Sequence, residues 1–393
     1  MKKHFVNLDG LRFVLAMFVL VAHAVVLGYK NAGRGDAILE ISPLHISANA
    51  ALFYFFTLSG FLITYILLSE LKKEETINKK NYYLKRILRI WPLYFFTLIL
   101  HWFVAPQFEF NRLLENMPTA NLGNFVIFDH NLSCLGGFLC YLFFLPQLAT
   151  TFALASNGTL FPAFHFWSIG VEEIFYLFIP VFLVWSRKIF RNLSSLTVSY
   201  YLLPAVLYFL HRYSAFHHLP VEKVFAFLFL FVFVNKFGCI LMGVLTAWLY
   251  VHHKEKLLKW CTWKTAILAF LITAIMIFKE IYLYIFIPEV YSFLFCFILV
   301  YLSENKLLLL ENKVIAYLGR ISYGIYLYHN LCIALVWYAL SRMQMNSAVL
   351  ASQVIACTLA TLLTILVSAA SFELFEKYFL TLKPGYPRKG KNP

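Results

Sequence analysis

The stretch that decides the fold is LDGLRFVLAMFVLVAHAVVLGY, residues Leu8–Tyr29. About 20 apolar residues cross a bilayer as a helix, so this run predicts a membrane span. The polar residues inside it are Arg12 near the start and His23 near the middle. Eleven residues on a helix turn through about 1,100°, roughly 20° beyond three full turns, so both side chains share one face about 16 Å apart.

A histidine deep in a membrane span is costly and is therefore a functional hypothesis by default. A neutral imidazole can take a proton from a hydroxyl near pH 7. A guanidinium one leaflet away can hold an anionic ligand. We therefore predict His23 as a reactive base and Arg12 as an anion-binding residue, with Asp9 as a candidate supporting residue.

The composition excludes a soluble protein. Of 393 residues, 61% are hydrophobic and 13% are charged, and the mean hydropathy is +0.74. A single soluble core cannot bury so much apolar surface, so we predict an all-α polytopic membrane protein. The net charge of +14 falls in short loops between apolar runs, which indicates membrane topology and not nucleic-acid binding. No cysteine has zinc-site spacing, so no metal is expected.

The hydropathy pattern predicts a bundle of about ten transmembrane helices. We place them at residues 9–29, 48–69, 88–105, 166–186, 195–212, 224–251, 263–279, 282–302, 321–340 and 348–372. The sixth is long enough to be broken near Asn235–Lys236. Residues 135–152 are apolar as well, and we interpret them as re-entrant or interfacial.

Basic segments set the predicted orientation. Lysines and arginines gather at the N-terminus, after the second, fourth and sixth helices, and in the tail. Ten helices put all of these segments on one side, the cytoplasm, with both termini there. A signal peptide ending near Ala22–Ala24 is an alternative reading, but the apolar run continues beyond it. We expect one membrane domain, residues 1–380, and a basic tail, residues 381–393.

Two further pairs of charged residues have a functional and a structural reading. Arg86 and Arg89 share a helix face at the start of the third span, where guanidinium groups can bind phosphate or simply anchor the topology. Glu172 and Glu173 lie near the outer end of the fourth span, and their side chains point about 100° apart. Glu172 is the better candidate to orient an imidazole or substrate, although an interfacial glutamate is the alternative.

The remaining candidates are weaker. Ser59 precedes Gly60 in the second span, where small residues favour close helix packing, and a nucleophilic role is the less favoured reading. Arg320 begins the ninth span, with Tyr323 and His329 following in LGRISYGIYLYHN. For His329, a hydrogen-bonded structural histidine and a functional one are equally open readings.

These pieces in this order resemble the acyltransferase-3 family of integral membrane acyltransferases. The resemblance rests on LDGLR with His23, FFTLSGFLIT, YLKRILRIWPLY, FWSIGVEEIFYLFIP, LGRISYGIYLYH and SFELFEKYF, which extend from Leu8 to Phe379. It implies an O-acyltransferase that moves an acyl group, usually acetyl from acetyl-CoA, to a hydroxyl of a cell-surface glycan or glycolipid. We expect no bound cofactor, a bacterial inner-membrane location and no C-terminal SGNH domain.

The resulting prediction is a path through the membrane. His23 would deprotonate the acceptor hydroxyl, while Arg12, Arg86 and Arg89 would bind the phosphates of acyl-CoA from the cytoplasm. The glycan would arrive from the opposite side, near Glu172. The rival class is a transporter or flippase without bond chemistry, disfavoured because the halves show no internal repeat. Cys134 and Cys140 share a loop in which a disulfide could form.

Overall fold

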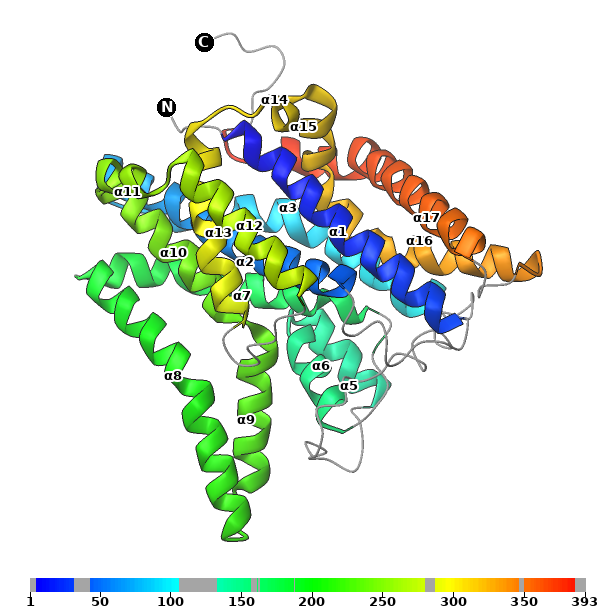
Figure 1. Ribbon diagram of the computed structural model, residues 1–393, viewed down its shortest axis with the longest axis horizontal. Helices are drawn as coiled ribbons and strands as arrows, with labels where there is room; N and C mark the ends of the chain where they lie inside the picture. Colours follow the sequence, from blue (N-terminus) through cyan, green and yellow to red (C-terminus); the bar gives the residue numbers. More distant parts are fainter. Residues whose placement is uncertain are drawn as a thin grey trace. The chain divides into compact units, whose positions relative to one another are not determined.

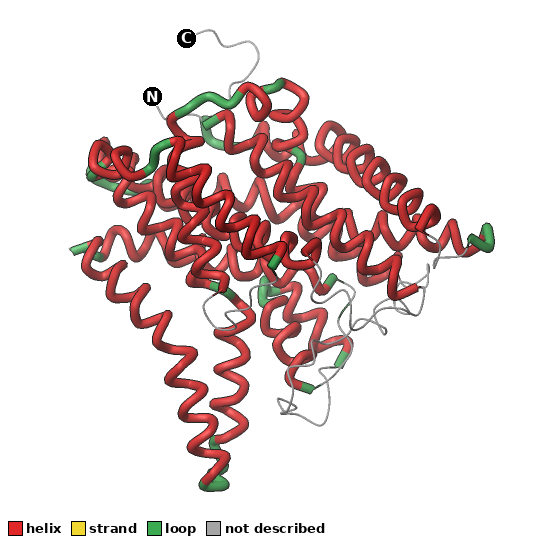
Figure 2. The backbone as a smooth tube through the Cα atoms, in the orientation of Figure 1, coloured by secondary structure: helices red, strands yellow, loops and turns green. Residues whose placement is uncertain are grey.

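A computed structural model describes residues 5–31, 43–105, 133–156, 161, 163–186, 188–279, 287–345 and 350–385. All regular elements in these ranges are helical (Figure 2). The prediction of an all-α membrane protein is therefore confirmed.

The number of long apolar helices agrees with the predicted bundle. Among the described residues, eight helices are long and apolar enough to cross a membrane, or up to ten if each of two bent pairs forms one span. One bent pair joins residues 222–235 to 237–252 at an angle of 49°. Lys236, between them, has a φ of 51°, so the break predicted at Asn235–Lys236 is present.

The chain divides into two compact units, each assembled from segments distant in sequence. Unit 1 comprises residues 1–4, 40–75 and 114–306, and unit 2 comprises residues 5–39, 76–113 and 307–393. The single domain expected over residues 1–380 stays a prediction. Residues 386–393 of the predicted tail lie outside the described part.

Unit 2 is organised around the first helix, which contacts four other helices. Its elements are α1 (Val6–Asn31), α3 (Lys79–Ile99), η1 (Leu100–Val104), α14 (Leu308–Glu311), α15 (Lys313–Arg320), α16 (Ser322–Arg342), α17 (Leu350–Ser371), η4 (Phe372–Glu376) and α18 (Lys377–Thr381). A Cβ on Gly319 of α15 would lie 1.9 Å from the carbonyl oxygen of Asp9. Only glycine therefore allows α15 to pack this closely against the start of α1.

Unit 1 contains the other helices. They are α2 (Pro43–Glu74), α5 (Cys134–Leu142), α6 (Pro146–Ala155), η3 (Phe164–Phe166), α7 (Trp167–Trp185), α8 (Ile189–Phe216), α9 (Glu222–Asn235), α10 (Phe237–His252), α11 (Lys254–Trp260), α12 (Trp263–Phe278) and α13 (Ile287–Glu304). In Figure 1, α8 and α9 form a long antiparallel hairpin.

Two glycines bring α2 and α10 into backbone contact. A Cβ on Gly60 would lie 2.2 Å from the carbonyl oxygen of Ile240, and a Cβ on Gly243 would lie 2.0 Å from that of Thr57. The prediction of small-residue packing around Ser59–Gly60 is thus correct at Gly60.

Residues 135–152 do not form one continuous span. They belong to α5 and α6, which have 9 and 10 residues, and about 20 are needed to cross a bilayer. The disulfide considered for Cys134 and Cys140 is absent, since both are free thiols. Six residues of one helix separate them by about 9 Å, beyond the Cα separation of about 4.4–6.8 Å that a disulfide requires.

Candidate functional site

The predicted arginines of α1 and α3 gather in one basic cluster of unit 2. Arg12 Nη1 lies 3.5 Å from Asp9 Oδ1, one helical turn away. Arg89 is close enough to Arg12 and Arg86 for their positive charges to repel one another. It is attracted by Asp9 and by Glu376, the last residue of η4. We call Arg12, Arg86, Arg89 and Lys383 the basic cluster.

Lys383 completes this cluster from the chain end beyond α18. Burial and the nearby positive charges of Arg89, Arg86 and Lys85 together lower its pKa to about 7, while Glu376 acts in the opposite sense. A lysine with such a pKa is only partly charged at neutral pH. An anionic ligand would favour the protonated form and make the cluster more positive.

Tyr323 connects α16 to the helix that carries the arginines. Its hydroxyl donates a hydrogen bond of 3.1 Å to the carbonyl oxygen of Ile90, the residue after Arg89. This contact restrains α3 next to the guanidinium group. Arg320, by contrast, is exposed, and its guanidinium lies 5.4 Å from the Tyr317 ring centre.

The predicted base lies in a pair of histidines. His23 Nδ1 on α1 is 2.8 Å from His329 Nε2 on α16, and the two rings stack with centres 5.1 Å apart. His329 is 1% exposed, whereas His23 is half-buried. His329 is thus a hydrogen-bonding partner of His23, and its structural and functional readings both stay predictions.

The hydrogen bonds determine which nitrogen of His23 is basic. His329 Nδ1 lies 2.6 Å from the carbonyl oxygen of Tyr326, which can only accept, so Nδ1 of His329 carries the proton. In the neutral ring, Nε2 of His329 is then an acceptor, and Nδ1 of His23 is the donor. The lone pair of neutral His23 is therefore on Nε2, the nitrogen that could take a proton from a substrate.

A third histidine accompanies the pair. His101 lies in η1, is fully buried, and its Nδ1 donates a hydrogen bond of 2.8 Å to the carbonyl oxygen of Thr97. It is near enough to His329 to interact electrostatically. Sequence reasoning missed His101 and Glu376. A histidine in an apolar span was a usable signal for the first; the second lies in the closing motif, but nothing local indicated its interaction with Arg89.

Glu172 of unit 1 lies in a separate polar group. Ser59 Oγ on α2 donates to Glu172 Oε1 at 2.7 Å, and the Tyr176 hydroxyl donates to Glu172 Oε2 at 2.9 Å. Ser59 is thus a hydrogen-bond donor to a carboxylate. Glu173 is half-buried on the same helix. The predicted roles of both glutamates in orienting an imidazole or acceptor stay predictions.

Comparisons with known proteins show which family this chain belongs to. A family model described as an acyltransferase domain matches residues 5–371. Peptidoglycan O-acetyltransferase OatA of Listeria monocytogenes is 25% identical over 191 residues, covering 49% of this chain and 26% of that protein. An uncharacterised Haemophilus influenzae protein is 29% identical over 166 residues, covering 41% of this chain and 58% of that protein. The chain thus spans less than two thirds of these relatives' length. No solved structure is significantly similar.

Proposed function

Because the chain belongs to the acyltransferase-3 family, we propose that it is a membrane O-acetyltransferase that moves acetyl from acetyl-CoA to a hydroxyl of a cell-envelope glycan. The observation that carries the proposal is the hydrogen bond between His23 and His329. It gives a membrane-embedded imidazole a defined tautomer and a lone pair on Nε2. The Listeria relative is named as a peptidoglycan O-acetyltransferase, which supports a glycan acceptor.

The basic cluster supports a donor with several phosphates. Guanidinium groups bind phosphate oxygens through paired hydrogen bonds, and Arg89 interacts electrostatically with both Arg12 and Arg86. In this proposal they hold the phosphates of acetyl-CoA. The thiol-bearing arm of the donor then extends about 16 Å along α1, the rise between Arg12 and His23.

The chemical step follows from the tautomer. His23 Nε2 takes the proton of the acceptor hydroxyl while that oxygen attacks the thioester carbonyl. The tetrahedral intermediate collapses, the C–S bond breaks, and the protonated His23 returns its proton to the departing CoA sulfur. His329 accepts the Nδ1–H of His23 throughout and keeps the ring oriented. The products are CoA thiol and an acetyl ester, with no covalent enzyme intermediate required.

Purified protein in detergent or vesicles tests this proposal. With acetyl-CoA and a soluble peptidoglycan or oligosaccharide acceptor, CoA release and acetylated glycan are measured together. His23→Ala is expected to lower acetyl transfer by about 10²–10⁴-fold, the contribution of a general base. His217→Ala is the matched control, since His217 is exposed in unit 1.

Two outcomes would refute the proposal. Near-normal transfer by His23→Ala would remove this residue from the chemistry. Glycan movement across vesicles without CoA release would instead favour a transporter. Broken membrane helices such as α9–α10 also occur in transporters.

The proposed orientation has its own test. The proposal puts both termini and the basic cluster on the cytoplasmic side of a bacterial inner membrane, where acyl-CoA is available. Single-cysteine variants at Asn192 and His217 report on opposite ends of α8. We expect labelling by an impermeant maleimide from outside at position 217 only. Labelling from outside at position 192 would invert the later helices and overturn the through-membrane scheme.

A further inference from the structure

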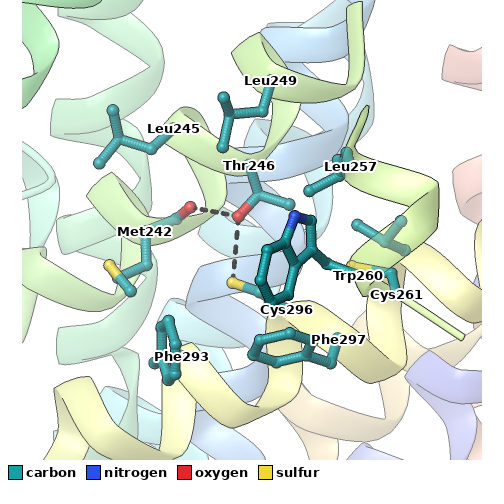
Figure 3. A pocket seen from close by; sticks show the side chains of 11 residues that line it. Met242, Leu245, Thr246, Leu249, Leu257, Trp260, Cys261, Phe293, Cys296 and Phe297 are labelled. Carbon is teal, nitrogen blue, oxygen red and sulfur yellow. Dashed lines mark hydrogen bonds between the residues drawn. The ribbon is translucent and has the colours of Figure 1, made fainter. Parts of the chain in front are cut away.

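Unit 1 contains a cavity whose lining includes none of the polar residues described above. It has a volume of about 310 Å³ and lies among α10, α11 and α13 (Figure 3). This size is at the lower end of ligand pockets, about 300–1,000 Å³. Helix α13, and α10 together with α9, are long and apolar enough to cross a membrane. Lipid chains are therefore among the molecules that could reach the cavity.

The lining of the cavity selects a hydrocarbon guest. Met242, Leu249 and Phe297 give it apolar walls. Thr246 contributes a hydroxyl group to the lining of the cavity. This hydroxyl donates a hydrogen bond of 2.8 Å to the Met242 carbonyl oxygen and lies 3.1 Å from Cys296 Sγ. These polar atoms satisfy one another. Water needs two to four polar partners, so a chain of methylene groups suits this cavity better.

One end of the cavity has the features of a membrane interface. Trp260 lines it and ends α11, and tryptophan favours the level of the lipid headgroups. Lys254 of this helix is neutralised by an ion pair of 2.7 Å with Glu304. Lys256 and Lys259 are exposed, and within the described residues neither forms an ion pair. Their charges complement an anionic headgroup.

We propose that this cavity binds one acyl chain of an anionic membrane phospholipid, whose phosphate contacts Lys256 and Lys259. The cavity takes the hydrocarbon and the basic face of α11 selects the headgroup. Each lysine near an anionic lipid surface contributes on the order of a few-fold to tenfold in affinity. The inference does not depend on the proposed acetyl transfer, because lipid retention is its readout.

Native mass spectrometry of the full chain tests the proposal. Detergent-purified protein is incubated with graded amounts of phosphatidylglycerol or phosphatidylcholine, and the retained lipid is counted. We expect one retained lipid and a preference for phosphatidylglycerol of about tenfold or more. Leu249→Trp fills the cavity and is expected to abolish retention of either lipid. Leu271→Trp is the control, since Leu271 is 51% exposed on α12.

The headgroup is tested separately. Lys256→Gln with Lys259→Gln is expected to remove the preference for phosphatidylglycerol while one lipid is still retained. Lys72→Gln with Lys73→Gln removes the same charge at the end of α2 and is expected to keep the preference. Equal retention of both lipids by the unchanged protein refutes the headgroup assignment. Undiminished retention by Leu249→Trp, or displacement of the phospholipid by a polyprenyl phosphate at equal concentration, refutes the proposed occupant.

Discussion

Replacing His329 separates a positioning role from a purely structural one. His329→Leu removes the acceptor that holds Nδ1–H of His23 at 2.8 Å. A buried donor left without a partner costs about 1–3 kcal/mol. If this free energy is lost from the reactive orientation of His23, kcat drops about 5- to 150-fold, because about 1.4 kcal/mol corresponds to a tenfold change in rate. The KM for acetyl-CoA is expected to stay unchanged, because the basic cluster is intact.

His329→Gln tests the same reasoning by rescue. Its side-chain carbonyl oxygen can accept the bond from His23, so we expect a loss below about fivefold. His252→Gln is the control, because His252 is an exposed histidine of α10 that bonds only locally to the Trp248 carbonyl oxygen. The assay is CoA release under saturating acceptor, with thermal unfolding measured in parallel. Equal losses in the Leu and Gln variants, or a loss entirely in KM, would refute the positioning role.

The remaining predictions concern the basic cluster and the helix packing. Arg86→Lys with Arg89→Lys keeps the charge but loses the paired hydrogen bonds, so the KM for acetyl-CoA should rise about tenfold or more. An unchanged KM would mean that these two residues only anchor the topology. The pKa of Lys383 is lowered to about 7, so this residue loses its charge and its contribution to phosphate binding as the pH rises through 7. The affinity for acetyl-CoA, measured by calorimetry, should therefore fall from pH 6 to pH 8. The affinity of Lys383→Gln should not depend on pH in this range. By the same shift, protein stability should rise between pH 7 and about 10.5, where the unfolded lysine binds the proton and the folded one does not. Gly243→Ala would put a Cβ 2.0 Å from the Thr57 carbonyl oxygen and should cost at least about 1–3 kcal/mol of stability, in contrast to Gly324→Ala, whose Cβ meets its nearest atom at 3.3 Å.

The sequence predicts the helical class and the spans because hydropathy and helix length are local properties. It also predicts the shared face of Arg12 and His23 by helical spacing alone. The break at Lys236 was foreseen because two polar residues interrupt an overlong apolar run.

The pairing of His23 with His329 could not be predicted from sequence, since 306 residues separate them and one sequence contains no distance information. Glu376 was missed for the same reason, since its interaction with Arg89 joins segments far apart in the sequence. His101 lies in an apolar span, where a histidine is a functional signal, and the sequence reasoning did not use that signal.

The contact between α2 and α10 also limits the motion of these two helices relative to each other. Backbones that touch at Gly60 and Gly243 leave no side-chain layer that could slide, so the two helices behave as one rigid block. Ser59, beside Gly60, presents its hydroxyl to Glu172 from that block. Hydrogen exchange should find the amides of this block among the slowest in unit 1.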